Sequence, residues 1–124
     1  MNVLLVDDSE ILRNHLMTIL SEIEHVTVIG ESTDTESAIQ ALQEKLPDLV
    51  ILDIRMPGEG GIHVLKIAKD KYPALRVIIY TDYPYPQYRV KCMELGADYF
   101  FDKSTETEKM IDKIRQLARQ TGER

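Results

Sequence analysis

Several features that are absent from the sequence exclude whole classes of protein. It has a single cysteine, so no internal disulfide can form, and a cytoplasmic location is the simplest expectation. No apolar run approaches the about 20 residues of a membrane-spanning helix, and Val3–Val6 is too short for a signal sequence, so we expect no membrane partner. The three histidines share no spacing that suits a metal. The net charge of -6 argues against nucleic acid as a direct partner, because phosphate backbones require clustered Lys and Arg.

Short apolar runs alternate with segments of helical periodicity along the chain. The predicted strands are residues 3–6, 26–30, 49–52, 75–80 and 99–101. After the first strand, Ile11, Leu16 and Leu20 recur at helical spacing. This alternation predicts an α/β fold, a flavodoxin-like (βα)5 doubly wound parallel sheet with strand order 2-1-3-4-5, although periodicity alone does not separate this order from others. The expected domain spans residues 1–120, with residues 121–124 as a C-terminal tail.

Polar side chains follow four of the predicted strands, at the point where each strand ends. These residues are Asp7 and Asp8, Asp53, Thr81 and Lys103. Because the carboxyl ends of parallel strands meet at one edge of the sheet, the three aspartates should share a crevice between the first and third strands. Carboxylates that close repel one another unless a cation intervenes, and Mg²⁺ is suited to carboxylate ligands.

These residue types suit phosphoryl transfer to Asp53. An aspartate can form an acyl phosphate, and charge neutralisation by Mg²⁺ and Lys103 is most of what such a transfer requires. Thr81 supplies a hydroxyl donor. Taken singly, each feature has a plainer explanation, because an Asp-Asp pair often caps a helix, a threonine can end a strand in a turn, and a lysine can be a solvated charge. Their coincidence at four strand ends favours the functional interpretation.

Four segments carry a family resemblance, namely residues 3–9, 52–58, 80–81 and 96–103. On these segments the chain resembles the CheY-like receiver domain of a two-component response regulator, over essentially its full length. The resemblance implies phosphorelay signalling, in which Asp53 accepts a phosphoryl group from a sensor histidine kinase or a phosphotransfer protein. It also implies that the chain is not an enzyme in the ordinary sense, since it would catalyse only its own phosphorylation and dephosphorylation.

The resemblance also implies a metal site. Mg²⁺, or Mn²⁺ in its place, would be held by Asp8, Asp53 and the backbone carbonyl of Arg55. Asp7 would assist through a water molecule. Lys103 would pair with Asp53 or with the phosphoryl group.

A conformational switch is implied as well. Thr81 would move to hydrogen-bond a phosphoryl oxygen, and Phe100, three residues before Lys103, takes the place of the switch aromatic. The plainer interpretation of Phe100 is a core aromatic. The surface of the fourth helix, fifth strand and fifth helix would change shape and control a downstream protein target or an output domain. The family also allows a homodimer that forms on phosphorylation.

The sequence departs from the family pattern at two positions near the expected site. Ser104 follows Lys103 where many relatives have proline in a cis bond. A cis Lys-Ser bond would cost about 3 kcal/mol, so that loop geometry is not assumed. Asp82 follows Thr81 where a small residue is usual, and its carboxylate would slow phosphorylation or strengthen the dependence on a cation.

Bulky residues stand at the expected mouth of the site. Arg55 and Tyr83 lie two residues past the acceptor and the hydroxyl donor, where we expect them to restrict water and lengthen the phosphorylated lifetime. Tyr83, Tyr85 and Tyr88 put three aromatic rings beside the expected switch face. Aromatic enrichment is typical of partner surfaces, and the alternative is that these rings cover the fourth helix.

Two other classes of protein compete with the receiver interpretation, and the sequence speaks against the first of them. An aspartate-nucleophile phosphohydrolase of the haloacid-dehalogenase type would carry a second Asp two residues after the nucleophile, where this chain has Arg55. A receiver-like interaction domain that is never phosphorylated is disfavoured by the intact set of site residues, but Asp82 keeps it open. No output domain follows the last predicted helix, so the chain is either a stand-alone receiver or a fragment of a longer regulator.

Overall fold

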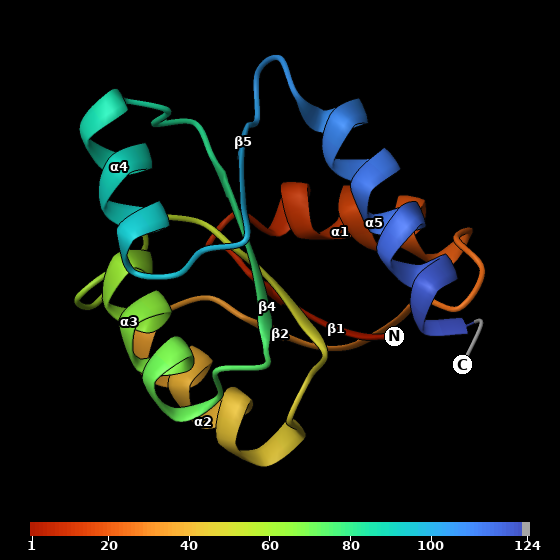
Figure 1. The fold of residues 1–124 in the computed structure, drawn as a ribbon, viewed down its shortest axis with the longest axis horizontal. Coiled ribbons are helices and arrows are strands. Elements are labelled where there is room, and N and C mark those ends of the chain that lie inside the picture. Colours follow the sequence, from red (N-terminus) through yellow and green to blue (C-terminus); the bar gives the residue numbers. More distant parts are fainter. Residues whose placement is uncertain (123–124) are drawn as a thin grey trace.

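Short apolar strands build one parallel sheet in the computed structural model, which describes residues 1–122 (Figure 1). The strands are β1 (Asn2–Val6), β2 (Thr27–Ser32), β3 (Leu49–Leu52), β4 (Arg76–Thr81) and β5 (Tyr99–Asp102). Their order is β2-β1-β3-β4-β5 and every neighbouring pair is parallel, which confirms the predicted flavodoxin-like topology. The chain winds in opposite directions from β1 and β3, so the switch point of the fold lies between these two strands.

Within residues 1–122, five helices cover the two faces of the sheet. They are α1 (Glu10–Ser21), α2 (Thr35–Lys45), α3 (Gly61–Lys71), α4 (Pro86–Glu94) and α5 (Thr107–Gly122). Helices α1 and α5 pack on one face, and α2, α3 and α4 on the other (Figure 1). Because successive strand residues point to opposite faces, Val3 and Leu5 join the core under α1 and α5, whereas Leu4 and Val6 join the other core.

Strand β3 lies in the middle of the sheet and is buried along its whole length. Each residue of Leu49–Leu52 is at most 3% exposed, which explains why the sequence has an unbroken apolar run here. The next residue continues the ladder, since the N–H of Asp53 donates to the carbonyl of Val6 at 3.0 Å. The end of this strand therefore fixes the position of Asp53 relative to β1.

Helix α1 matches its predicted pattern except at its first turn. Ser9 is the N-cap, and its hydroxyl accepts a hydrogen bond from the N–H of Leu12 at 3.2 Å. Leu16 and Leu20 are buried as predicted, but Ile11 is 84% exposed. The apolar periodicity of the helix therefore includes one side chain that the core does not use.

The last helix runs close to the end of the chain. Helix α5 includes Thr121 and Gly122, which we expected in the C-terminal tail, and residues 123 and 124 lie outside the described residues. None of the helices in residues 1–122 combines the length and the apolar character that crossing a membrane requires.

Candidate functional site

Three carboxylates converge at the carboxyl end of the sheet. Asp7 follows β1 and Asp53 follows β3, and the pairing of Val6 with Leu52 sets the two aspartates side by side. Both are only 5% exposed, whereas Asp8 is exposed. Carboxylate oxygens of the three aspartates lie within 4.8 Å of one another. Oxygen ligands at this spacing fit a hard divalent cation such as Mg²⁺.

The ammonium of Lys103 bridges two of these carboxylates. Its Nζ donates to Oδ2 of Asp7 at 2.6 Å and to Oδ2 of Asp53 at 3.2 Å. The backbone of Lys103 is anchored on β4, because its N–H donates to the carbonyl of Thr81 at 2.9 Å. The peptide bond to Ser104 is trans, as are all peptide bonds among the described residues. Since the cluster has three carboxylates and one ammonium, it keeps a net negative charge that favours a bound cation.

Burial and neighbouring charges act against each other at Asp53. Burial has the largest effect and raises the pKa of its carboxyl above the ordinary value. The charge of Lys103 lowers this pKa and the charge of Asp7 raises it, while the N–H of Ile54, 2.8 Å from Oδ1, lowers it. At Lys103, burial lowers the pKa of the ammonium, but its contacts with the two carboxylates outweigh burial and raise it. The lysine therefore stays charged, and a cation near Asp53 would favour the ionised carboxylate.

Thr81 and Phe100 are buried in the neighbouring strands β4 and β5. Thr81 is fully buried, and its hydroxyl accepts a hydrogen bond from the N–H of Tyr83 at 3.0 Å. Phe100 is 5% exposed and belongs to the same apolar core as Cys92. The guanidinium of Arg89 lies 4.5 Å from the centre of the Phe100 ring. The ring is thus packed inward, with a cation over one face.

Arg55 and three tyrosines form a connected group, which we call the aromatic rim (Arg55, Tyr83, Tyr85 and Tyr88). The guanidinium of Arg55 lies 4.0 Å from the centre of the Tyr83 ring and donates to the Tyr88 hydroxyl at 3.3 Å. The ring centres of Tyr83 and Tyr85 are 6.4 Å apart, and those of Tyr85 and Tyr88 are 5.7 Å apart. The rim therefore joins the loop after β3 to the loop after β4.

Most of the predicted site residues line one hollow of about 430 Å³. Its lining includes Asp7, Asp8, Asp53, Lys103, Arg55 and Tyr83, together with Asp82. Thr81 and Phe100 do not line the hollow, because both are buried in the strands beside it. Asp82 brings a further exposed carboxylate to the same opening.

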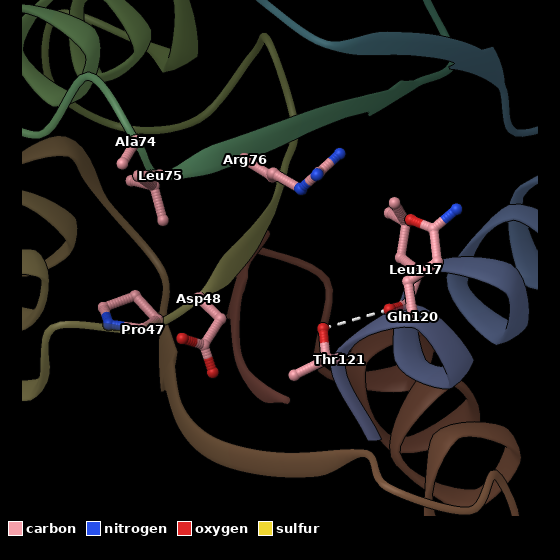
Figure 2. Close-up of a pocket in the computed structure, with 8 residues that line it drawn as sticks. All are labelled: Pro47, Asp48, Ala74, Leu75, Arg76, Leu117, Gln120 and Thr121. Carbon is pink, nitrogen blue, oxygen red and sulfur yellow. Dashed lines mark hydrogen bonds between the residues drawn. The ribbon is translucent and has the colours of Figure 1, made fainter. Parts of the chain in front are cut away.

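A second hollow, of about 400 Å³, lies at the opposite edge of the sheet (Figure 2). Its walls come from the start of β3, the start of β4 and the end of α5, and they include Asp48, Arg76 and Thr121. Asp48 accepts a hydrogen bond from the N–H of Asn2 at 2.6 Å, and the Thr121 hydroxyl donates to the carbonyl of Leu117 at 3.0 Å. Among residues 1–122, the metal-ligand cluster of three carboxylates lies at the other edge, so the second hollow is not part of the candidate site.

Among the contacts near the site that the sequence-based predictions do not include, two stand out by the residues that make them, Arg89 and Thr35. One is the placement of Arg89 over Phe100. The other is made by Thr35, whose hydroxyl contacts Pro57 and Gly60, which lie 22 and 25 positions further along the chain. No local spacing marks such contacts. The glycines after Asp53 are the one available signal, because glycine allows close approach of a backbone.

Nearly the whole chain matches one protein family. The family model of the response regulator receiver domain matches residues 3–115. This chain belongs to that family. The receiver domain is 30% identical over 115 residues to the response regulator GacA of Pseudomonas aeruginosa, a match that covers 93% of this chain and 54% of that protein. The chain spans about half the length of the curated relatives it matches.

Solved structures share the fold of this receiver domain. The response regulator domain of Thermotoga maritima CheB has a TM-score of 0.84 at 28% identity, covering 97% of this chain and 94% of that chain. A chain in the CheX–CheY–BeF3–Mg²⁺ complex from Borrelia burgdorferi has a TM-score of 0.86 at 28% identity, covering 94% and 88%. Both matches cover more than nine-tenths of this chain, so the similarity concerns the whole fold and not one segment of it.

Proposed function

We propose that this receiver domain is a phosphorylation switch. Asp53 accepts a phosphoryl group from the phosphohistidine of a sensor histidine kinase or a phosphotransfer protein, and the modification controls binding to another protein. The observation that carries the proposal is the setting of Asp53, which is 5% exposed, lies 3.2 Å from the Lys103 ammonium and shares a cation-ligand cluster with Asp7 and Asp8. The catalytic role is limited to the chain's own phosphorylation and dephosphorylation.

The transfer moves one phosphoryl group between two nucleophiles. A carboxylate oxygen of Asp53 attacks phosphorus, the phosphorus–nitrogen bond breaks, and the imidazole nitrogen of the donor keeps the electron pair and takes a proton from solvent. Lys103 offers its positive charge to the phosphoryl oxygens as charge leaves the carboxylate. Because Lys103 also donates to Asp7 at 2.6 Å, its ammonium stays anchored when Asp53 is modified.

The acidic cluster fits Mg²⁺, which would supply the positive charge that neutralises the transferring phosphoryl oxygens. Asp8, Asp53 and the backbone carbonyl of Arg55 would hold the ion, and Asp7 would contribute through water. Mn²⁺ suits the same oxygen ligands. The Borrelia burgdorferi CheY relative supports this assignment, because its complex with CheX contains BeF3 and Mg²⁺.

The phosphodonor has to approach Asp53 through the opening of the hollow. Ile11, in the first turn of α1, is 84% exposed and lies three residues after Asp8. Tyr85, in the aromatic rim, is 47% exposed. We infer that these apolar groups flank the approach and are buried by the protein that carries the phosphohistidine.

Thr81 would relay the modification to the surface formed by α4, β5 and α5. Its hydroxyl oxygen accepts from the N–H of Tyr83, so turning toward a phosphoryl oxygen would disturb the loop after β4, which carries Tyr83 and Tyr85. Because the Phe100 ring is already buried, we expect phosphorylation to alter its contact with Arg89 and not to rotate the ring by a large angle. The exposed α4 face, with Val90 at 57% exposure, would then offer its altered shape to a target protein, an output domain or a second copy.

Intact-mass spectrometry after incubation with acetyl phosphate tests the proposal. We expect one phosphoryl adduct that requires Mg²⁺, disappears in Asp53→Asn, and persists in Asp82→Asn at an equal or higher rate. A parent that stays unmodified with acetyl phosphate and with phosphorylated phosphotransfer proteins would favour a receiver-like interaction domain that is not regulated by phosphorylation. The presence of Asp82 in the hollow is the observation behind that second candidate.

A further inference from the structure

One side chain fastens the loop after Asp53 to the start of α2. Thr35 is the first residue of α2 and is 6% exposed. Its N–H and its hydroxyl both donate to the carbonyl of Pro57, at 3.0 and 3.2 Å. The same hydroxyl accepts a hydrogen bond from the N–H of Gly60 at 2.8 Å. We call these three hydrogen bonds the Thr35 latch.

The loop after Asp53 packs so closely around the Thr35 latch that some of its positions accept only glycine. A Cβ at Gly58 would lie 2.8 Å from Cβ and Oγ1 of Thr35, and its φ of +97° itself favours glycine. At the base of the loop, the N–H of Gly61 donates to the carbonyl of Ile54 at 2.7 Å. A Cβ at Gly61 would collide with the backbone carbonyl oxygen of Asp53. The loop is therefore closed at its base by its own backbone and at its tip by Thr35.

Arg55 lies inside this closed loop. The next residue, Met56, is 8% exposed and its side chain belongs to the apolar core, which also holds the backbone of this loop in place. We propose that Thr35 is a positioning residue for a cation: its hydroxyl fixes the loop, and the loop sets how well the Arg55 carbonyl meets a cation held by the three aspartates. This inference rests on the proposed function, which makes that carbonyl a ligand.

If Thr35 positions the loop, removing its hydroxyl should lower the affinity for Mg²⁺ and also the preference for Mg²⁺ over Ca²⁺. Thr35→Val keeps the shape of the side chain but removes both hydroxyl hydrogen bonds, which leaves the N–H of Gly60 without its acceptor. Mg²⁺ demands near-octahedral geometry at short distances, whereas Ca²⁺ accepts flexible geometry. A loosened loop should weaken Mg²⁺ binding about tenfold, the lower end of what outer-shell partners of metal ligands contribute, and Ca²⁺ binding by less.

The test compares Thr35→Val with the parent by nuclear magnetic resonance. Titrations of amide signals give the dissociation constants for Mg²⁺ and Ca²⁺, and hydrogen exchange at the Gly60 amide reports on the latch in the metal-free protein. Thr35→Ser keeps the hydroxyl and should retain the Mg²⁺ affinity of the parent. Two controls should leave both constants unchanged: Thr33→Val makes the same change at an exposed position, and Ile114→Val removes a buried methyl from the opposite core.

Several results would overturn the inference. One is equal Mg²⁺ affinity in Thr35→Val and the parent despite faster exchange at Gly60. Others are equal weakening of Mg²⁺ and Ca²⁺ binding, or weakening of the same size in Ile114→Val, because both indicate a general loss of stability. If Thr35→Val fails to fold, Thr35→Ala removes the same hydroxyl. If the parent is phosphorylated with Mg²⁺ but Thr35→Val binds Mg²⁺ as tightly as the parent, the proposed function stands and only the role of Thr35 is refuted. If the parent binds no Mg²⁺, both proposals are refuted.

Discussion

Replacing Lys103 by methionine should destabilise the metal-free protein. Lys103→Met keeps an apolar stem and removes the ammonium that lies 2.6 Å from Asp7 and 3.2 Å from Asp53. The three side chains are at most 10% exposed, so solvent screens these contacts weakly. With an effective dielectric constant of about 20, each contact amounts to about 5 to 6 kcal/mol before the cost of burying the ammonium. After that cost, we expect a net loss of about 3 kcal/mol, as for other buried ion pairs that lose one partner.

The size of this loss should depend on pH. Without Lys103, a charge that lowers the pKa of Asp53 is missing, so this pKa rises further above its ordinary value. A carboxyl with a raised pKa in the folded state binds protons more readily when folded, so protonation stabilises the fold as the pH falls. The deficit of Lys103→Met should therefore be largest near neutral pH and should shrink toward about pH 4, the ordinary range of an aspartate.

Urea unfolding followed by far-ultraviolet circular dichroism, in the presence of EDTA, measures this deficit. Lys109→Met is the matched control, because Lys109 is 74% exposed and its nearest carboxylate oxygen, on Glu106, is 3.8 Å away. The control should change stability by no more than about 0.5 kcal/mol. Saturating Mg²⁺ should reduce the deficit, since a cation replaces part of the lost charge. A Lys103→Met protein as stable as the parent at neutral pH, or a deficit that grows on acidification, would refute the reasoning.

Further predictions concern Asp53, the aromatic rim and Cys92. Because burial raises the pKa of Asp53, its ionised form costs stability near neutral pH. Asp53→Asn should therefore unfold at higher urea than the parent in EDTA, and a gain that does not shrink toward about pH 4 would contradict this. Arg55→Ala and Tyr83→Ala should shorten the half-life of phosphorylated protein, followed by loss of the phosphoryl mass after donor removal, whereas unchanged half-lives would exclude shielding by the rim. Burial raises the pKa of the Cys92 thiol to about 11, so a thiol reagent near neutral pH should label the protein only after denaturant is added. Rapid labelling of the native protein would instead indicate local opening of α4.

The residues at the strand ends could be predicted because their positions follow from chain direction. Parallel strands deliver their next residues to the same edge of the sheet, whatever the loops between them do. Asp7, Asp53 and Lys103 were expected together on this ground, and the observed contacts of Lys103 follow from it. Strand order needed more than periodicity, since the same alternation suits several doubly wound sheets.

Contacts between side chains on different loops could not be predicted in this way. Arg89 lies over Phe100 and Arg55 over Tyr83 because the paths of separate segments bring each guanidinium to a ring. Neither contact follows from spacing along the sequence. Ile11 is the converse case, because it fits the periodicity of α1 yet is 84% exposed. Periodicity identifies the apolar side of a helix but does not say how much of it the sheet covers.

The ammonium that completes the site comes from late in the chain. Lys103 stands 96 positions after Asp7 and 50 after Asp53, and it reaches both because β5 pairs with β4. A nascent or partly unfolded copy without this last strand still presents acidic residues, but it has no lysine beside the acceptor. Under the proposed function, efficient phosphorylation would therefore require β5 to be in place, because only then does the Lys103 ammonium lie beside Asp53.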